Sequence, residues 1–190
     1  MIAPPRIELE TEALLTGEEA LALGDIGSYE LVEGRIVPMP PTGDLHGGHE
    51  NRFAFYITRH VWEHQLGRIR VGDSGIFTHR NPDTVRGADV AYISNERYAQ
   101  RKQKSGFLDV APDLVVEVMS PDDRWSEVIQ KLREYFAIGV RLVWVADPES
   151  RTVYAYRAIT NLQEFTETDN LIAEDVLPGF SVPVAQLFEE

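Results

Sequence analysis

The segment from residue 114 to residue 145 constrains the fold more than any other part of the chain, because its pattern is strand, helix, strand. The apolar run at 114–119 predicts a strand that is buried on both faces. Residues 125–138 carry apolar side chains at helical spacing, and Gly139 stands where a helix commonly ends. The apolar part of "RLVWVAD" predicts the second strand. Such a unit nearly always forms a right-handed crossover between parallel strands, so at least part of the sheet should be parallel.

The rest of the chain adds further strands and helices to this unit. A capping-box signal at Thr16 and Glu19 predicts a short helix that ends near Gly24. We expect one α/β domain over residues 1–190, with a mixed sheet flanked by helices and an N-terminal β-hairpin. The other expected elements are a hairpin around Glu33-Gly34, a helix from about His49 to Gln65, strands in "GRIRVGDSGIFTH" and "TVRGADVAYIS" with a turn at "RNPD", a helix in the basic segment "NERYAQRKQK", a strand in "TVYAYR" and a short pair of strands near the C-terminus.

Charge and composition indicate which cellular location and which binding partners to expect. The formal net charge is −13, but residues 1–45 and 142–190 each carry nine acids against two bases. Residues 46–141 carry 13 acids and 14 bases, so a polyanionic partner such as DNA is not excluded. The chain has no cysteine, which excludes disulfides and cysteine-ligated zinc. It also lacks a run of about 18 apolar residues and a secretory signal at its N-terminus, so we expect a cytoplasmic protein without a membrane partner.

Glu117 interrupts the apolar run at 114–119. A charged carboxylate in a dry interior is costly unless another group pairs with it or a metal ion binds it. Asp89 occupies a similar position in "VRGADVAYIS", where Gly87 and Ala91 on the same face leave room around it. Two acids on adjacent strands can share a divalent metal ion. Each acid alone is equally compatible with a salt bridge or with a position at the end of a strand.

Lys131 would bring a positive charge to these acids. It lies on the apolar stripe of the predicted helix, three residues after Val128, and should therefore face the sheet. There its ammonium group could polarise water or stabilise the negative charge that develops on a phosphate. The alternative is a lysine whose ammonium group extends past the apolar surface into solvent.

Five stretches of the sequence match the order and spacing of a known family. They are "YELVEGRIVPMPPTGDLHG", "RGADVAYIS", "PDLVVEVMSPDDR", "KLREYFAIGVRLVWVADPESRTVYAYR" and "LPGFSVPVAQLF". Through them the chain, from about residue 14 to residue 188, resembles the Uma-two family of endonucleases, within the PD-(D/E)xK restriction-endonuclease-like superfamily.

The resemblance implies a metal-dependent nuclease core that acts on DNA. In it, Asp89 and Glu117 would bind Mg2+, with Mn2+ as an alternative ion. The resemblance also implies that Glu30 and His46 lie near the site, where either side chain could orient water or phosphate. A hairpin-edge acid and a histidine at the start of a helix are the alternatives for these two residues. A homodimer would fit paired cuts in the two strands of DNA.

Two positions depart from the superfamily pattern. The proline-aspartate pair of its name is Ala88-Asp89 here, whereas Pro112-Asp113 is on the strand of Glu117, with Asp113 about 13 Å away along it. The third position of the E-x-K motif is Met119, so the resemblance implies that the lysine comes from Lys131 on the next helix. Two interpretations follow: an active nuclease, or a catalytically inactive nuclease fold that binds nucleic acid or protein.

Basic residues that could contact phosphates gather in "NERYAQRKQK". Arg97 and Arg101 share one face of the helix expected there. Arg68 and Arg70, on one face of an expected strand, are similar candidates. A solvated surface is the alternative in each case. The candidates for DNA binding in this segment are Arg97, Arg101, Lys102 and Lys104.

Two histidine motifs suggest a different class of enzyme. His60 and His64 in "HVWEH" match the H-x-x-E-H pattern, in which histidines one helical turn apart bind zinc. His46 and His49 in "HGGH" also have a spacing compatible with a metal ion. Neither motif has a recognisable third ligand, and hydrogen-bonded histidines are commoner. A zinc hydrolase is therefore the second rival of the nuclease.

Overall fold

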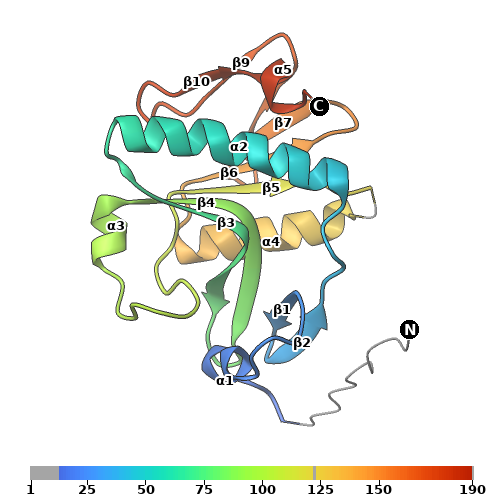
Figure 1. The fold of residues 1–190 in the computed structure, drawn as a ribbon, viewed down its shortest axis with the longest axis vertical. Helices are drawn as coiled ribbons and strands as arrows, with labels where there is room; N and C mark the ends of the chain where they lie inside the picture. The colour runs from blue at the N-terminus through green and yellow to red at the C-terminus, as the bar shows by residue number, and fades with distance from the viewer. Residues whose placement is uncertain (1–12, 122, 190) are drawn as a thin grey trace.

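An eight-stranded mixed sheet forms the centre of the computed structural model, which describes residues 13–121 and 123–189 (Figure 1). The N-terminal segment, on which the expectation about a secretory signal rests, lies mostly outside these residues. The strand order is β2-β1-β4-β5-β6-β7-β8, and β3 pairs with the other edge of β4. The strands are β1 (Tyr29–Val32), β2 (Arg35–Pro38), β3 (Gly67–His79), β4 (Thr84–Ser94), β5 (Leu114–Val118), β6 (Leu142–Asp147), β7 (Thr152–Ala158) and β8 (Asn161–Phe165).

Two long helices cover opposite faces of this sheet (Figure 1). On one face, α2 (Asp44–Glu63) packs Phe53 and Ile57 into a core that includes Trp144. On the other face, α4 (Trp125–Ile138) buries an apolar stripe against β5 and β6. The described part of the chain has no helix with the length and apolar character needed to cross a membrane. The remaining elements are α1 (Gly17–Ala22), α3 (Asn95–Ala99), β9 (Asn170–Ile172), β10 (Ser181–Pro183) and α5 (Val184–Leu187).

The strand-helix-strand prediction is confirmed, because β5 and β6 pair in parallel and α4 connects them. α4 ends at Gly139, whose φ of +96° is a left-handed conformation that a side chain would strain. The capping box is also present, since the Thr16 side chain accepts a hydrogen bond from Glu19 N and the Glu19 carboxylate accepts one from Thr16 N. Local signals therefore fix the ends of both helices.

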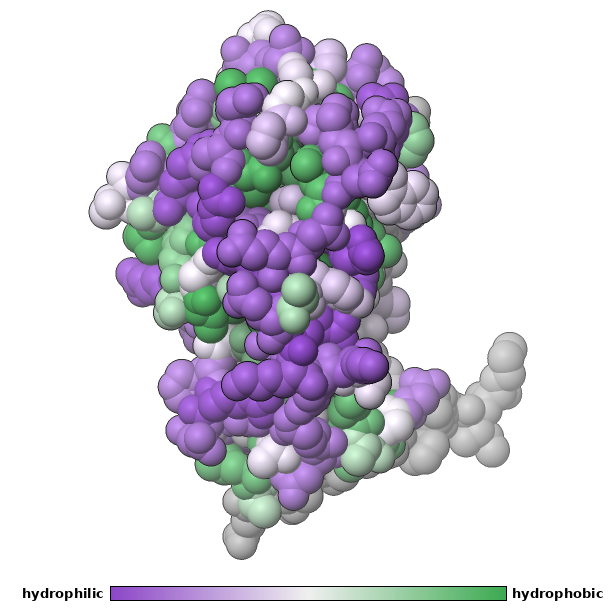
Figure 2. All heavy atoms as spheres, turned by 90° about the vertical axis from the view of Figure 1, so that its left-hand side faces the viewer, coloured by the Kyte–Doolittle hydropathy of each residue, from purple (hydrophilic) through white to green (hydrophobic). Residues whose placement is uncertain are grey.

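Other elements differ from the prediction. α2 begins at Asp44, ahead of the start expected at about His49, and therefore includes His46 in its first turn. The basic segment is helical only as far as Ala99, because backbone N–H groups of the following loop donate to the Asp109 carboxylate instead of continuing the helix. Strand β8 was not predicted, since four of its five residues are exposed and show no apolar alternation. Figure 2 turns the α3 side toward the viewer, and hydrophilic side chains gather in a broad band across the middle of that face.

The second edge of β4 is divided between two partners. β5 pairs with its C-terminal half, where Val90 lies opposite Val116, and β1 pairs with its beginning, where Leu31 lies opposite Val85. Between these contacts β1 and β5 separate, so the sheet forks along residues 86–89 of β4. Backbone groups at a fork have lost their neighbouring strand and need other hydrogen-bond partners. The fork is where the acidic side chains of the strands collect.

Candidate active site

Two carboxylates satisfy the backbone at the fork of the sheet. Glu30 Oε1 accepts a hydrogen bond from Gly87 N at 3.1 Å, and Asp89 Oδ2 accepts one from Val118 N at 2.6 Å. Glu30 and Asp89 are only 5% and 7% exposed, respectively. Each carboxylate therefore takes the place of a strand-to-strand hydrogen bond, which explains why acids occupy these buried positions and fixes where they point.

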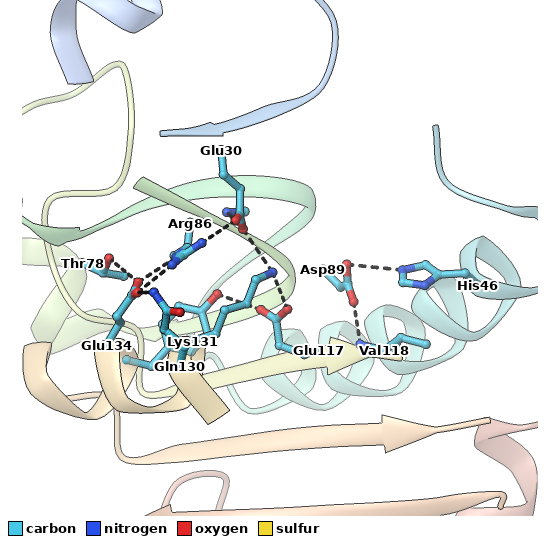
Figure 3. A network of polar contacts seen from close by, with 12 residues as sticks. Glu30, His46, Thr78, Arg86, Asp89, Glu117, Val118, Gln130, Lys131 and Glu134 are labelled. Carbon is cyan, nitrogen blue, oxygen red and sulfur yellow. Dashed lines mark hydrogen bonds and ion pairs between the residues drawn. The ribbon is translucent and has the colours of Figure 1, made fainter. Parts of the chain in front are cut away.

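Lys131 extends from α4 into the same fork (Figure 3). Its Nζ donates to Glu117 Oε2 at 3.0 Å and lies 3.1 Å from Glu30 Oε1. The hydroxyl of Tyr135, one helical turn further along α4, donates to Glu117 Oε1 at 2.7 Å. Both oxygens of Glu117 are therefore held by α4. Glu117 and Met119 share the face of β5 that is turned to α4, so Lys131 approaches Glu117 from the side on which a lysine at position 119 would lie.

The protonation states of Lys131, Glu117 and Tyr135 depend on burial and on the charges of neighbouring side chains. Burial opposes the charge of Lys131, but the carboxylates of Glu117 and Glu30 outweigh it and raise the lysine pKa above its ordinary value. Burial raises the pKa of Glu117 to about 7, against the opposing effect of Lys131. Burial and the neighbouring Glu117 raise the pKa of Tyr135 as well. At neutral pH Lys131 and Tyr135 are thus protonated donors, whereas Glu117 is close to its titration point.

A second layer of charges surrounds Glu30. Arg86 Nη1 lies 2.8 Å from Glu30 Oε2, and Arg86 Nε donates to Glu134 Oε2 at 2.7 Å. Glu134 also accepts hydrogen bonds from Thr78 and Gln130. Arg86 and Lys131 are the cations and Glu30, Glu117 and Glu134 the anions of one continuous network (Figure 3). Buried charges that are fully paired in this way rigidify a site.

A separate group of potential metal ligands lies on the other side of Asp89. One ligand atom each from His46, Glu50 and Asp89 falls within 4.8 Å of the others. His46 Nε2 lies 3.4 Å from Asp89 Oδ1, while His46 Nδ1 is hydrogen-bonded to Ser120 Oγ at 3.0 Å. Glu50 Oε1 accepts a hydrogen bond from Gly72 N at 2.8 Å. One imidazole and two carboxylates form a donor set that suits a divalent cation.

The pKa values in this group show how closely the acids lie. The hydrogen bond to Asp89 raises the pKa of His46. Burial raises the pKa of Glu50, and the neighbouring Asp89 adds to the effect. Asp73, in a bulge of β3, has a pKa that is raised first by burial and then by Asp89. Glu50 and Asp73, whose charged forms are disfavoured, would both gain from a bound cation.

The fork brings together five residues singled out in the sequence: Glu30, His46, Asp89, Glu117 and Lys131. Sequence reasoning missed Glu50, Arg86, Ser120, Glu134 and Tyr135. Two of these had a usable signal, because Glu50 follows His46, and Tyr135 follows Lys131, by one helical turn.

Asp113, which the sequence set aside as a site residue, and Arg97, a candidate for DNA binding, both lie away from the fork. Asp113, at the opposite end of β5, is 3% exposed, accepts a hydrogen bond from Ser94 N at 2.7 Å and lies 3.3 Å from Arg97 Nε. Arg97 also donates to the backbone carbonyls of Ala111, Pro112 and Gly139. Its guanidinium group therefore joins α3 to the loops around it, in place of the surface position expected for a DNA contact.

The histidines of the zinc interpretation bond to the backbone. His60 Nε2 lies 3.0 Å from Pro178 O, and His64 Nδ1 lies 2.9 Å from His60 O. Of the residues that the structure describes, only His46, Glu50 and Asp89 form a group of three potential ligands. His49 packs edge-on against Phe188 in the core, so the two histidines of "HGGH" do not share a site. Nothing in this geometry favours the zinc hydrolase.

Comparison with known proteins is consistent with this geometry. The model of the Uma2 (Uma-two) family, described as "Putative restriction endonuclease", matches residues 18–185. The chain is also similar to a crystal structure of a "putative nuclease belonging to DUF820" from Anabaena variabilis ATCC 29413, with a TM-score of 0.75 and 22% identity over 92% of this chain and 97% of that chain. This likeness confirms the predicted fold class. Comparison with curated proteins gave no match. Family model and fold together support a nuclease, and because the family model spans most of the sequence, the chain belongs to the Uma2 family.

Proposed function

We propose that this chain is a divalent-metal-dependent endonuclease that hydrolyses phosphodiester bonds in DNA. The position of Lys131 is the observation that carries the proposal. Its Nζ lies 3.0 Å from Glu117 Oε2 and 3.1 Å from Glu30 Oε1, next to the group of potential metal ligands (Figure 3). Phosphodiester hydrolysis builds negative charge on phosphate oxygens, and a cation held in place before the reaction stabilises that charge most effectively.

The donor set at the fork suits the proposed metal ion. His46, Glu50 and Asp89 would hold the ion, with Glu117 beside them, and Mg2+ is the ion that the family resemblance implies, with Mn2+ as the alternative. A bound divalent ion supplies positive charge to the phosphate and makes water more acidic. The carboxylates at the fork would hold that water in line with the scissile bond by accepting its hydrogen bonds.

Lys131 acts through its charge in this proposal. Because its pKa is raised, its ammonium group stays protonated at neutral pH and cannot accept a proton from water. It can donate hydrogen bonds to a phosphate oxygen that enters between Glu117 and Glu30. Arg86 holds Glu30 from the opposite side, and Tyr135 holds Glu117, so both partners of the ammonium group keep their orientation. Lys131 would thereby take the role of the motif lysine, whose position in the sequence is occupied by Met119.

Supercoiled plasmid tests the activity. We expect the chain to cut plasmid DNA when Mg2+ or Mn2+ is present and to leave it intact when EDTA removes the ion. Nicked circles would indicate cuts in single strands, and linear molecules would indicate the paired cuts expected of a homodimer.

Intact plasmid with either ion would contradict the nuclease. If the chain then bound duplex DNA with an affinity that fell steeply with salt, the inactive nuclease fold would be supported instead. The methionine at position 119 and the net charge of −13 are the features that favour this alternative.

A group of three arginines is the best candidate for the contact with DNA. The guanidinium groups of Arg68, Arg70 and Arg101 lie 5.4, 5.5 and 4.7 Å from the centroid of the Tyr98 ring. Their hydrogen bonds go to neutral groups, which are backbone carbonyls, Asn95 and the Tyr98 hydroxyl. None of the three has a carboxylate partner among residues 13–121 and 123–189, and in a chain with this excess of acids such cations are available to phosphates.

In the register of β3 and β4, Arg68 and Arg70 lie near the fork. Arg70 lies opposite Ala91 and Arg68 opposite Ile93, on the same face of β4 as Asp89. Ala91 is two residues from Asp89, which is about 7 Å along the strand. A DNA strand lying on the arginines could therefore bring a phosphate a few nucleotides away to the fork.

The double substitution Arg68→Gln and Arg70→Gln should weaken DNA binding at every sequence and lower the salt dependence. Two lost phosphate contacts would reduce the slope of log affinity against log salt by about 1–2. Anisotropy of a labelled duplex, titrated at several salt concentrations without divalent ion, measures both quantities. Arg133→Gln is the control, because it makes the same kind of substitution, with the loss of one charge, at an exposed position of α4. Equal slopes for the double variant, the control and wild type would rule out this surface.

A further inference from the structure

The imidazole of His46 is fixed from both sides. Its Nδ1 is hydrogen-bonded to Ser120 Oγ at 3.0 Å. Its Nε2 faces Asp89 Oδ1 at 3.4 Å, a contact drawn in Figure 3. The other two potential ligands of the group, Glu50 and Asp89, offer oxygen atoms. His46 is therefore the one nitrogen donor in the group.

Ser120 itself is held in place. It follows β5 in a tight turn, in which Ser120 N donates to Asp123 Oδ2 at 2.8 Å and Asp123 N donates to Ser120 O at 3.0 Å. The Ser120 hydroxyl is thus carried by the same strand end as Glu117. When Nδ1 carries the proton and donates it to Ser120 Oγ, the lone pair of His46 lies on Nε2, which points into the ligand group. Ser120 selects the form of the imidazole that can bind a cation.

One nitrogen donor changes which metal ion the group prefers. Mg2+ binds oxygen ligands almost exclusively and gives up its water reluctantly. Imidazole is a better ligand for the divalent ions of the first transition series, and Mn2+ also accepts carboxylates readily. With three carboxylate oxygens the group would have suited Mg2+, but with His46 it suits Mn2+ better.

We propose that His46, positioned by Ser120, makes this site selective for Mn2+ over Mg2+. This inference rests on the proposed function, because it concerns the metal ion of that site. Ser120 touches neither the ion nor the DNA in this account and is a positioning residue. The prediction concerns binding of the metal ions themselves, so it can be measured without DNA cleavage.

Isothermal titration of the full chain with MnCl2 and with MgCl2 tests the proposal. We expect wild type to bind Mn2+ at least about tenfold more tightly than Mg2+. His46→Asp, which makes all three donors oxygen, should remove that preference. Ser120→Ala should lower the affinity for Mn2+ by about 10- to 100-fold, the usual cost of losing a group that orients a ligand, with a smaller change for Mg2+. Ser120→Thr keeps the hydroxyl and should restore the affinity.

Two controls distinguish a folding defect from a loss of metal binding. Ser126→Ala removes an exposed hydroxyl near the start of α4 and should bind both ions like wild type. Circular dichroism should show the same thermal transition for Ser120→Ala and Ser120→Thr in the absence of metal. If Ser120→Ala unfolds at a lower temperature than wild type, the test rests on the Mn2+ affinity of Ser120→Thr compared with that of wild type. A folded Ser120→Thr variant that binds Mn2+ more weakly than wild type would then overturn the proposal.

The possible outcomes separate this inference from the proposed function. Equal affinities of wild type for Mn2+ and Mg2+, or unchanged Mn2+ affinity in both Ser120→Ala and His46→Asp, would overturn the selectivity and leave a metal-dependent nuclease intact. No binding of either ion to wild type would overturn both. Labelling of Ser120 by a fluorophosphonate would also overturn the inference, because it would show that His46 activates the serine as a nucleophile.

Discussion

Lys131→Met is expected to lower plasmid cleavage by about 10²- to 10³-fold, the effect of removing one group that stabilises transition-state charge. Methionine keeps the apolar stem of lysine and removes the ammonium group that lies between Glu117 and Glu30. Rates measured with saturating metal ion, on plasmid, would show the loss. Arg133→Met on the exposed side of the same helix should cleave at the wild-type rate.

The same substitution should also cost stability. It leaves Glu117 without its charged partner in a site where the side chain is only 13% exposed. Breaking a buried ion pair typically costs about 3–5 kcal/mol, and the cost is smaller where the remaining carboxyl takes up a proton, as Glu117 readily does with a pKa of about 7. Urea unfolding at pH 8 and pH 6 measures this, and the variant should be less impaired at pH 6. Wild-type cleavage by a folded Lys131→Met variant would mean that the ammonium group has only a structural role.

Asp89→Asn is expected to lower metal affinity by more than about 100-fold and to abolish measurable cleavage. The asparagine carbonyl can still accept the hydrogen bond from Val118 N, but the negative charge beside His46 is gone. Loss of a group that only orients a ligand costs about 10- to 100-fold in metal affinity, so loss of a ligand itself should cost more. Titration with Mn2+ measures the affinity, and plasmid cleavage gives the second readout.

Asp113→Asn is the matched control for this substitution. Asp113 is also a buried aspartate of the sheet that accepts a backbone hydrogen bond, but it lies at the other end of β5 and pairs with Arg97. Both variants should lose some stability, and only Asp89→Asn should lose the metal ion. Equal metal affinity in the two variants would show that Asp89 is a structural acid, like Asp113.

The centre of the fold follows from the sequence because its signals are local. The apolar run of β5, the helical spacing of α4 and the glycine at position 139 each lie within one element, and together they predicted the parallel pair of strands. Glu117 could be singled out for the same reason, since a carboxylate in such a run needs a partner. Its partner Lys131 could be named because it lies on the apolar stripe of α4, and a side chain on that stripe faces the sheet.

The surroundings of the site depend on contacts between distant parts of the chain. Arg86 pairs with Glu30 and Glu134, which are 56 and 48 residues away, and no spacing in the sequence indicates these pairs. Glu50 was overlooked because the expected helix began at about His49 and did not include His46, whereas packing against the sheet extends α2 back to Asp44 and places the two residues one helical turn apart. Arginine is usually found at the surface, so the sequence favoured an exposed Arg97. The backbone carbonyls to which Arg97 donates come from separate loops and lie around it only when the chain has folded.

Plasmid cleavage by wild type and by Glu117→Gln, side by side and with Mg2+ or Mn2+, tests the account most directly. Glutamine has nearly the shape of glutamate but carries no charge, and its single carbonyl oxygen can replace only one of the two carboxylate oxygens that accept from Tyr135 and Lys131. We expect wild type to cut the plasmid and Glu117→Gln to leave it intact, with circular dichroism showing that the variant is folded at the assay temperature. Equal cleavage by both would contradict the assignment of the active site to the fork of the sheet.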